Sequence, residues 1–96
     1  RVHLADAVAM YAVAILHGTR SHQRVRLGAS TRGGVALVSL AKAFSFMAGR
    51  DYVAPHDIAR AALSALPHRL VMAGSERAHA ADVVAECIAA VQAPRR

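Results

Sequence analysis

Apolar residues recur at helical spacing in four stretches of the chain. The first stretch runs from about Leu4 to His22 and has Asp6 in its first turn, where a negative charge suits the helix dipole. Its apolar positions are Leu4, Val8, Tyr11, Ala12, Ile15 and Leu16. The fourth stretch ends before Pro94 and has the clearest amphipathic pattern, formed by Val83, Val84, Cys87, Ile88 and Val91. The pattern therefore predicts an amphipathic helix near each end of the chain.

The second stretch is apolar around nearly its whole circumference. It begins after Ser30, a favourable N-cap residue, and continues to about Ala48. Its apolar positions are Val35, Leu37, Val38, Leu40, Ala41, Phe44, Phe46 and Met47. Only a narrow polar stripe remains, formed by Ser39, Lys42 and Ser45. This pattern predicts a central helix that packs on more than one side.

The third stretch begins at Pro55, which suits the first position of a helix, with Asp57 in its opening turn. Its apolar stripe consists of Ile58, Ala62, Ala65 and Leu66, and Pro67 then stops or kinks the helix. Short extended segments are expected near Val25-Leu27, Tyr52-Val53 and Leu70-Met72. Together these elements predict an all-α fold, a small four-helix bundle with short extended segments.

Composition is consistent with this fold and adds expectations about the whole protein. Hydrophobic residues make up 55% of the chain but aromatic residues only 4%, so helices rich in alanine should pack closely around a thin core. The 96 residues suit a single domain. No run approaches the roughly 20 apolar residues of a membrane span, and no signal peptide is evident, so a cytoplasmic location is expected. Arg1 at the start and Pro94-Arg95-Arg96 at the end indicate a fragment of a larger protein.

The formal net charge of +6 rests on eleven arginines and one lysine spread along the chain. This charge is compatible with nucleic acid or another anionic partner. However, the arginines form no evident stripe, and no aromatic residues that could stack on bases are interleaved with them. Nucleic acid is therefore an unfavoured partner, although an autonomous nucleic-acid-binding module and a helical protein-interaction module both stay open as alternative functions.

Motifs for catalysis or metal binding are not found in this sequence. The six histidines form no His-Glu-x-x-His motif, and His17 and His22 lie on different faces of their predicted helix, so no metal site is predicted. Cys87 lies in an apolar pattern and is predicted to be a small buried hydrophobic residue rather than a nucleophile. No glycine-rich phosphate loop is present. The chain on its own is therefore predicted to be non-catalytic.

Arg32 stands at the entrance of the second predicted helix, behind a turn at Gly28. A helix start is already electropositive, because its first amides are unpaired and its peptide dipoles are aligned. An arginine adds like charge at this point, so an anion is expected to compensate for it. That anion is either a ligand or a carboxylate of the chain, such as Asp51.

Several short motifs occur in the order and spacing of a known family. They are Tyr11, Leu16, Thr19-Arg20, Arg26 to Arg32 (RLGASTR), Ala41-Lys42-Ala43, Gly49 to Pro55 (GRDYVAP), Asp57-Ile58 and His68-Arg69-Leu70. The series resembles the C-terminal lid domain of MoxR-type AAA+ ATPases over most of the chain. "GASTR" followed by "GRDYVAPHDI" and then "HRL" is far more specific than any single motif.

The resemblance implies that residues 1–96 are a helical lid that follows an ATP-binding core in a longer chain. It implies that Arg32 is the sensor-two arginine, which reaches the phosphates of ATP in its own or a neighbouring subunit, with Ser30 and Gly33 as neighbouring nucleotide contacts. For Ser30, a purely structural cap is the alternative. ATP and Mg²⁺ would be held mainly by the core. The parent protein would couple ATP hydrolysis to lid rotation in a ring, a hexamer, and would act as a chaperone or maturation factor on a client that the sequence does not name.

The chain departs from the family pattern at three places. Gly33 and Gly34 stand where alanines are usual and are expected to loosen the helix that carries Arg32. Ala54 replaces a serine or threonine cap, and Pro67 precedes His68-Arg69, so the third helix is expected to end early. The resemblance assigns His68 and Arg69 to an interdomain or intersubunit contact, with a solvated arginine at a helix end as the alternative.

Overall fold

Four α-helices make up most of the computed structural model, which describes residues 2–22, 25–28, 30–72 and 80–94. The helices are α1 (Asp6–Ser21), α2 (Thr31–Met47), α3 (Pro55–Ala65) and α4 (Ala80–Ala90). A 3₁₀ turn, η1 (Pro67–Arg69), follows α3, and the strands β1 (Val25–Leu27) and β2 (Val71–Met72) form an antiparallel pair. The predicted all-α bundle is therefore confirmed, and two of the predicted extended segments form its strands.

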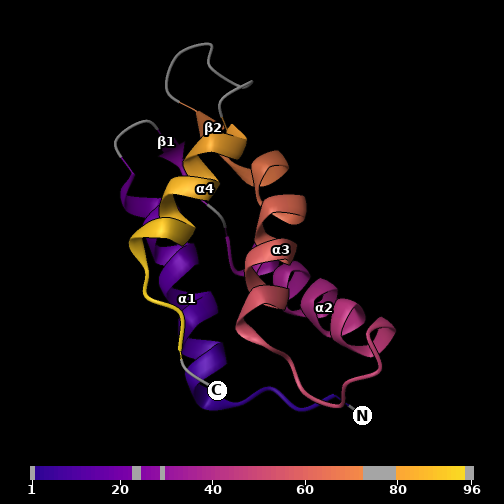
Figure 1. Cartoon of the computed structure of the whole chain (residues 1–96). Coiled ribbons are helices and arrows are strands. Elements are labelled where there is room, and N and C mark those ends of the chain that lie inside the picture. Colours follow the sequence, from indigo (N-terminus) through magenta and orange to yellow (C-terminus); the bar gives the residue numbers. More distant parts are fainter. Residues whose placement is uncertain (1, 23–24, 29, 73–79, 95–96) are drawn as a thin grey trace.

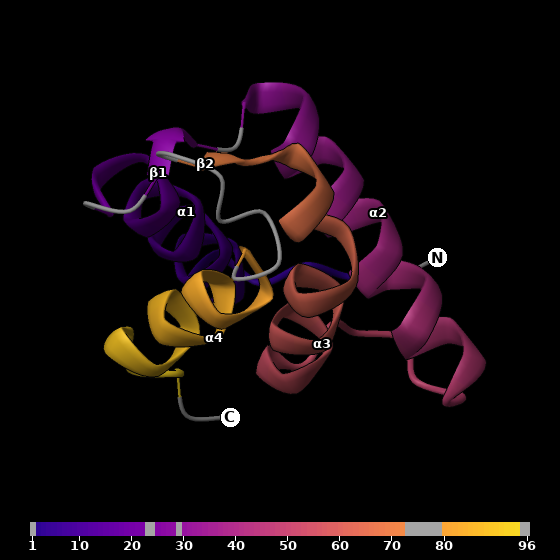
Figure 2. The same ribbon diagram turned by 90° about the horizontal axis from the view of Figure 1, so that it is seen from above.

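The helices are arranged as two neighbouring pairs. Figure 1 shows α1 beside α4 and α2 beside α3, with the strands at one end, and Figure 2 shows the same pairs from above. Each helix contributes at least one fully buried side chain, and these are Ile15, Leu37, Ile58 and Val83. The four helices therefore share one core. No helix of the described part of the chain is long and apolar enough to span a membrane.

Local sequence signals fix the starts of α2 and α3. The Ser30 hydroxyl accepts a hydrogen bond from the Gly33 amide at 3.4 Å, as expected of an N-cap. Ala54 has no acceptor in its side chain, but its amide donates to Asp57 Oδ2 at 2.8 Å, which is one half of a capping box. At the other end of α2, Gly49 has φ +79°, a conformation that ends helices and favours glycine.

The predicted central position of the second helix is wrong. Only one face of α2 is buried, at Gly33, Leu37, Ala41 and Ser45. Other apolar side chains of α2 are exposed: Val35 by 62%, Phe46 by 75% and Met47 by 78%. Apolar periodicity indicates which faces avoid water, but not whether the same chain covers them. Part of the apolar surface of α2 is not covered by the described residues of this domain.

Two predicted helix bounds need small corrections, and a third is as expected. The first helix begins at Asp6 rather than Leu4, because His3 pairs with residues 51–53: its amide donates to Asp51 O at 2.8 Å and its carbonyl accepts from Val53 N at 2.9 Å. This contact is a parallel bridge between His3 and Tyr52, the third predicted extended segment. The third helix ends at Ala65, just before Pro67 as expected. The fourth ends at Ala90, so Pro94 does not terminate it.

Candidate functional site

Arg32 lies in the first turn of α2, and its side chain is exposed. The first turn of α2 contains no acidic residue. Because the aligned peptide dipoles leave partial positive charge at this end of the helix, Arg32 adds to a site that already attracts anions.

Within the described ranges, no carboxylate forms an ion pair with Arg32. The predicted alternative partner, Asp51, lies beyond the opposite end of α2. The helix has 17 residues, which corresponds to a length of about 25 Å. The pairing of Arg32 with Asp51 is therefore ruled out, and the positive charge at the start of α2 is not neutralised by a described side chain.

Ser30 and Gly33 hold the turn that carries Arg32. Besides the bond between the Ser30 hydroxyl and the Gly33 amide, the Gly34 amide donates to Ser30 O at 3.1 Å. Both glycines lie inside α2, and Gly33 is buried. The cap predicted for Ser30 is confirmed, and these bonds fix the backbone on both sides of Arg32.

The loop before Arg32 passes unusually close to α1, a contact that the sequence pattern does not predict. A Cβ atom added at Gly28 would lie 2.6 Å from Arg20 Cα and 2.7 Å from Arg20 N. These are backbone atoms of a helix, which cannot move away cheaply. Any residue larger than glycine would push the loop away from α1, so Gly28 sets the position from which α2 begins.

The C-terminal end of α2 carries a different set of charged groups. Arg50 binds Asp57 in a fork, with Nη1 at 2.5 Å from Oδ2 and Nη2 at 2.9 Å from Oδ1. Asp57 is only 2% exposed, and the hydrogen bond from Arg50 lowers the pKa of its carboxyl below the ordinary value, an effect that the Ala54 amide reinforces. Arg50 also lies over the Tyr52 ring, 5.7 Å from its centroid. The sequence pattern does not predict this pair, although both residues stand in the GRDYVAPHDI motif.

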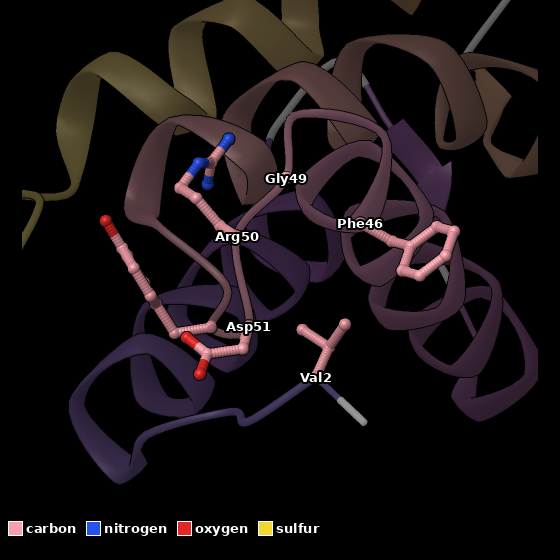
Figure 3. Close-up of a pocket in the computed structure, with 6 residues that line it drawn as sticks. Val2, Phe46, Gly49, Arg50 and Asp51 are labelled. Atoms are coloured by element: carbon pink, nitrogen blue, oxygen red, sulfur yellow. The ribbon is translucent and has the colours of Figure 1, made fainter.

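A pocket of about 510 Å³ lies beside this pair, lined by Val2, Phe46, Gly49, Arg50, Asp51 and Tyr52. Figure 3 shows Val2 below the Phe46 ring and the Arg50 guanidinium pointing away from Val2. The guanidinium is bonded to Asp57, so it is committed to the fold rather than to a ligand. We regard this pocket as a structural feature of the loop between α2 and α3.

His68 and Arg69 lie in η1, and both are exposed. Their link to the Arg32 turn runs through the backbone: β2 follows η1 and pairs with β1, which leads toward α2. Within the described part of the chain, no hydrogen bond or ion pair brings His68 or Arg69 to Arg32.

The remaining candidates for chemistry serve the fold. Cys87 is buried, as predicted, and burial raises the pKa of its thiol. Arg60 stacks on the Phe44 ring, 4.1 Å from its centroid, and joins α3 to α2. Among the residues placed by the structure, no group of three or more His, Cys, Asp or Glu side chains could hold a metal ion.

A comparison with known families identifies the domain. The sequence profile of the AAA lid domain family matches residues 17–91, which is 75 of the 96 residues. The chain belongs to this family. The lid is 40% identical to "Uncharacterized protein YeaC" of Bacillus subtilis (strain 168) over 97% of this chain and 30% of that protein. It is 31% identical to "Chaperone MoxR1" of Mycobacterium tuberculosis over 69% of this chain and 20% of that protein.

A solved structure has the same fold. A protein from Cytophaga hutchinsonii ATCC 33406, named "putative ATPase", matches 98% of the lid with a TM-score of 0.87 and 25% identity. The lid covers 32% of that chain, so it spans less than a third of each of these three proteins. The predicted resemblance to the lids of MoxR-type AAA+ ATPases is therefore confirmed.

Proposed function

We propose that this lid follows the ATP-binding core of a longer AAA+ ATPase and supplies Arg32 to the bound nucleotide as its sensor-two arginine. One observation carries the proposal: an exposed arginine stands at the positive end of α2 without a described carboxylate partner. Such a site lacks an anion. The terminal phosphate of ATP would supply one, and a planar guanidinium can bind two phosphate oxygens at once.

Arg32 would stabilise the charge that spreads over the terminal phosphoryl group during its transfer to water. Ser30 and Gly33 would hold the turn beside the phosphates. The core would hold most of the nucleotide and the Mg²⁺, which neutralises phosphate charge when it is bound. Because the bond between Arg32 and phosphate exists only before the product leaves, its loss would let the lid rotate away from the core.

The similarity to a chaperone supports a wider proposal for the parent protein. We infer a ring-shaped assembly, a hexamer, that acts as a chaperone or maturation factor on client proteins. In such a ring the exposed His68 and Arg69 of η1 would contact the core or a neighbouring subunit.

The nucleic-acid alternative has less support. Two of the arginines are used inside the domain, since Arg50 binds Asp57 and Arg60 stacks on Phe44. A titration with duplex DNA at several salt concentrations tests this alternative, because phosphate contacts would make the affinity fall steeply with salt.

The test of Arg32 is an ATPase assay on the full-length protein. Arg32→Ala should lower turnover tenfold or more, which corresponds to about 1.4 kcal/mol of transition-state stabilisation. Arg32→Lys should recover only part of the loss, because an ammonium group cannot make the forked contact. Asp51→Ala, which removes one charge from an exposed side chain beyond the opposite end of α2, is the control and should leave turnover unchanged. Normal turnover in Arg32→Ala would overturn the assigned role.

A further inference from the structure

Three residues separate β1 from α2, and they connect the strand pair to the turn that carries Arg32. At one end of this loop, β1 is held by β2, with Leu27 paired to Val71. At the other end, the Ser30 hydroxyl caps α2. A loop this short has a defined geometry, so the position of Gly28 decides where Arg32 stands.

Gly28 meets the backbone of α1 directly. A Cβ atom there would lie 2.6 Å from Arg20 Cα, whereas carbon atoms in contact are normally about 3.5 to 4.0 Å apart. The φ of Gly28 lies outside the left-handed region, unlike that of Gly49, so glycine is required for space rather than for backbone conformation. An alanine at this position would therefore have to move the loop about 1 Å away from α1.

The end of α1 is braced from behind by α4. Gly18 and Arg20 are two residues apart, so they face nearly opposite sides of α1. On the Gly18 side, a Cβ atom would lie 3.4 Å from both Cβ and Sγ of Cys87, so α4 already packs closely there. His22 at the end of α1 binds Glu86 of α4, with Nε2 2.8 Å from Oε1. The end of α1 therefore has little room to yield, and a clash with the loop has to be relieved by the loop.

We propose that Gly28 is a positioning residue for Arg32. Its missing side chain lets the loop rest on the backbone of Arg20, and this contact sets where the guanidinium meets the terminal phosphate. The inference deepens the proposed function and rests on it, because Arg32 must contact a phosphate for its position to matter. A displacement of about 1 Å can cost an active site a factor of about 100 in rate. The shift that an alanine requires is therefore large enough to measure in turnover.

Gly28→Ala in the full-length protein is the first test. We expect kcat for ATP hydrolysis to fall about tenfold, with the KM for ATP changed less than about twofold, because in the proposed function the core holds most of the nucleotide. In a crystal structure superposed on α1, the Arg32 Cα atom should lie about 1 Å from its position in the unsubstituted protein. An Arg32 Cα atom that has not moved would overturn the proposal whatever the turnover.

Alanine substitutions of two other glycines serve as controls. Gly34→Ala lies on the same turn as Arg32, and its Cβ atom would meet Leu16 Cδ1 at 2.9 Å, the end of a flexible side chain that can turn aside. Gly49→Ala strains the backbone at φ +79°, but nothing lies within 4 Å of the added atom, at the opposite end of α2. Both controls should keep the Arg32 Cα atom within about 0.5 Å and kcat within about twofold. A loss in either control as large as that at position 28 would contradict a role for the contact with α1.

A double substitution separates positioning from a general loss of structure. If Gly28 acts through Arg32, Gly28→Ala should lower kcat by less than about twofold once Arg32→Ala has removed the guanidinium. A purely structural effect would multiply the two losses instead. Multiplied losses would therefore overturn the positioning role.

An insertion covers the case in which Gly28→Ala does not fold. One extra glycine after Gly28 lengthens the loop without bringing a side chain against Arg20, and surface loops tolerate such insertions. The start of α2 is then no longer held at its distance from α1, so kcat should again fall about tenfold. Full kcat in this variant would overturn the proposal.

Failure of this proposal is distinguishable from failure of the proposed function. Normal turnover in Arg32→Ala would remove the nucleotide role of Arg32, whereas the crystal structure of Gly28→Ala would still show whether the loop rests on Arg20. A shifted Arg32 with unchanged kcat in Gly28→Ala, beside a loss of turnover in Arg32→Ala, would overturn the positioning role alone.

Discussion

The two ends of α2 use arginine in opposite ways. At the C-terminal end, Arg50 is fixed by two hydrogen bonds to a carboxylate that is 2% exposed, and the nearby Ser45 hydroxyl donates to Tyr52 O at 2.8 Å. At the N-terminal end, Arg32 is exposed and has no ion pair with a described carboxylate. One arginine completes the fold, whereas the positive charge of the other is not neutralised by a described carboxylate.

The difference separates two roles within the motifs that resemble MoxR-type lids. The GRDYVAPHDI segment joins α2 to α3 through contacts that the domain makes with itself. The GASTR segment directs its hydrogen bonds to the start of α2 and leaves the arginine side chain exposed. Substitutions at the two ends should therefore affect different properties, stability at one and nucleotide chemistry at the other.

The largest effect on stability is expected for Asp57→Ala. The substitution removes two charged hydrogen bonds to Arg50 and the bond from the Ala54 amide. Arg50 keeps 20% of its side chain in solvent, so the loss should fall below the range for a fully buried pair, at about 2 to 3 kcal/mol. Urea denaturation of the 96-residue chain measures it. This would be a large share of the stability of a small domain.

Asp51→Ala is the matched control, because Asp51 is exposed and uses only its backbone carbonyl to bind His3. Its free energy of unfolding should stay within about 0.5 kcal/mol of the unsubstituted chain. Equal losses in the two variants would contradict the structural role of the Asp57 carboxylate.

A smaller loss of stability is expected when the pH of the unsubstituted protein is lowered. The folded-state pKa of Asp57 is lowered, mainly by Arg50, so the carboxylate stabilises the fold fully above the unfolded-state pKa of about 3.9. This stabilisation is lost as the pH falls through the folded-state value. The melting temperature should therefore drop below pH ~4, and it should drop less in Asp57→Asn, which starts from a lower stability. Parallel pH profiles of the two proteins would show that other groups cause the acid response.

The smallest effect on stability is expected for Arg32→Ala. Removing like charge from the positive end of α2 should leave the free energy of unfolding unchanged or raise it by about 0.3 kcal/mol. Urea denaturation of the 96-residue chain tests this, beside the ATPase assay of the full-length variant. A loss of more than about 1 kcal/mol would show that Arg32 has a structural partner.

Local signals explain why most of the fold could be predicted. Ser30 and Pro55 each mark a helix start within one turn of sequence, and Pro67 marks a helix end. The pairing of β1 with β2 and the bridge between His3 and Tyr52 could not be predicted, because residues more than forty positions apart must meet. The exposed side of α2 was misjudged for a related reason, since periodicity does not identify the partner of a helix face.

The candidate site was predictable only in part. The GASTR motif led to Arg32 through the resemblance, but the absence of an ion-pair partner among the described carboxylates depends on where Asp51 lies in space. Arg50 and Asp57 are seven residues apart on either side of a loop, so no helical or strand period brings them together. Gly28 reads as an ordinary turn residue, and only the packing of its loop against Arg20 shows why a side chain cannot fit there.

The bridge between His3 and Tyr52 anchors the C-terminal end of α2. It ties the start of the described chain to the segment that Ser45 binds, at the C-terminal end of the helix, while Arg32 stands at the other end. A rigid rod of about 25 Å that turned by about 10° around the tied end would carry the Arg32 side of α2 through about 4 Å. That displacement exceeds the length of a hydrogen bond, so a modest rotation would be enough to make or break the contact with phosphate that we propose for Arg32.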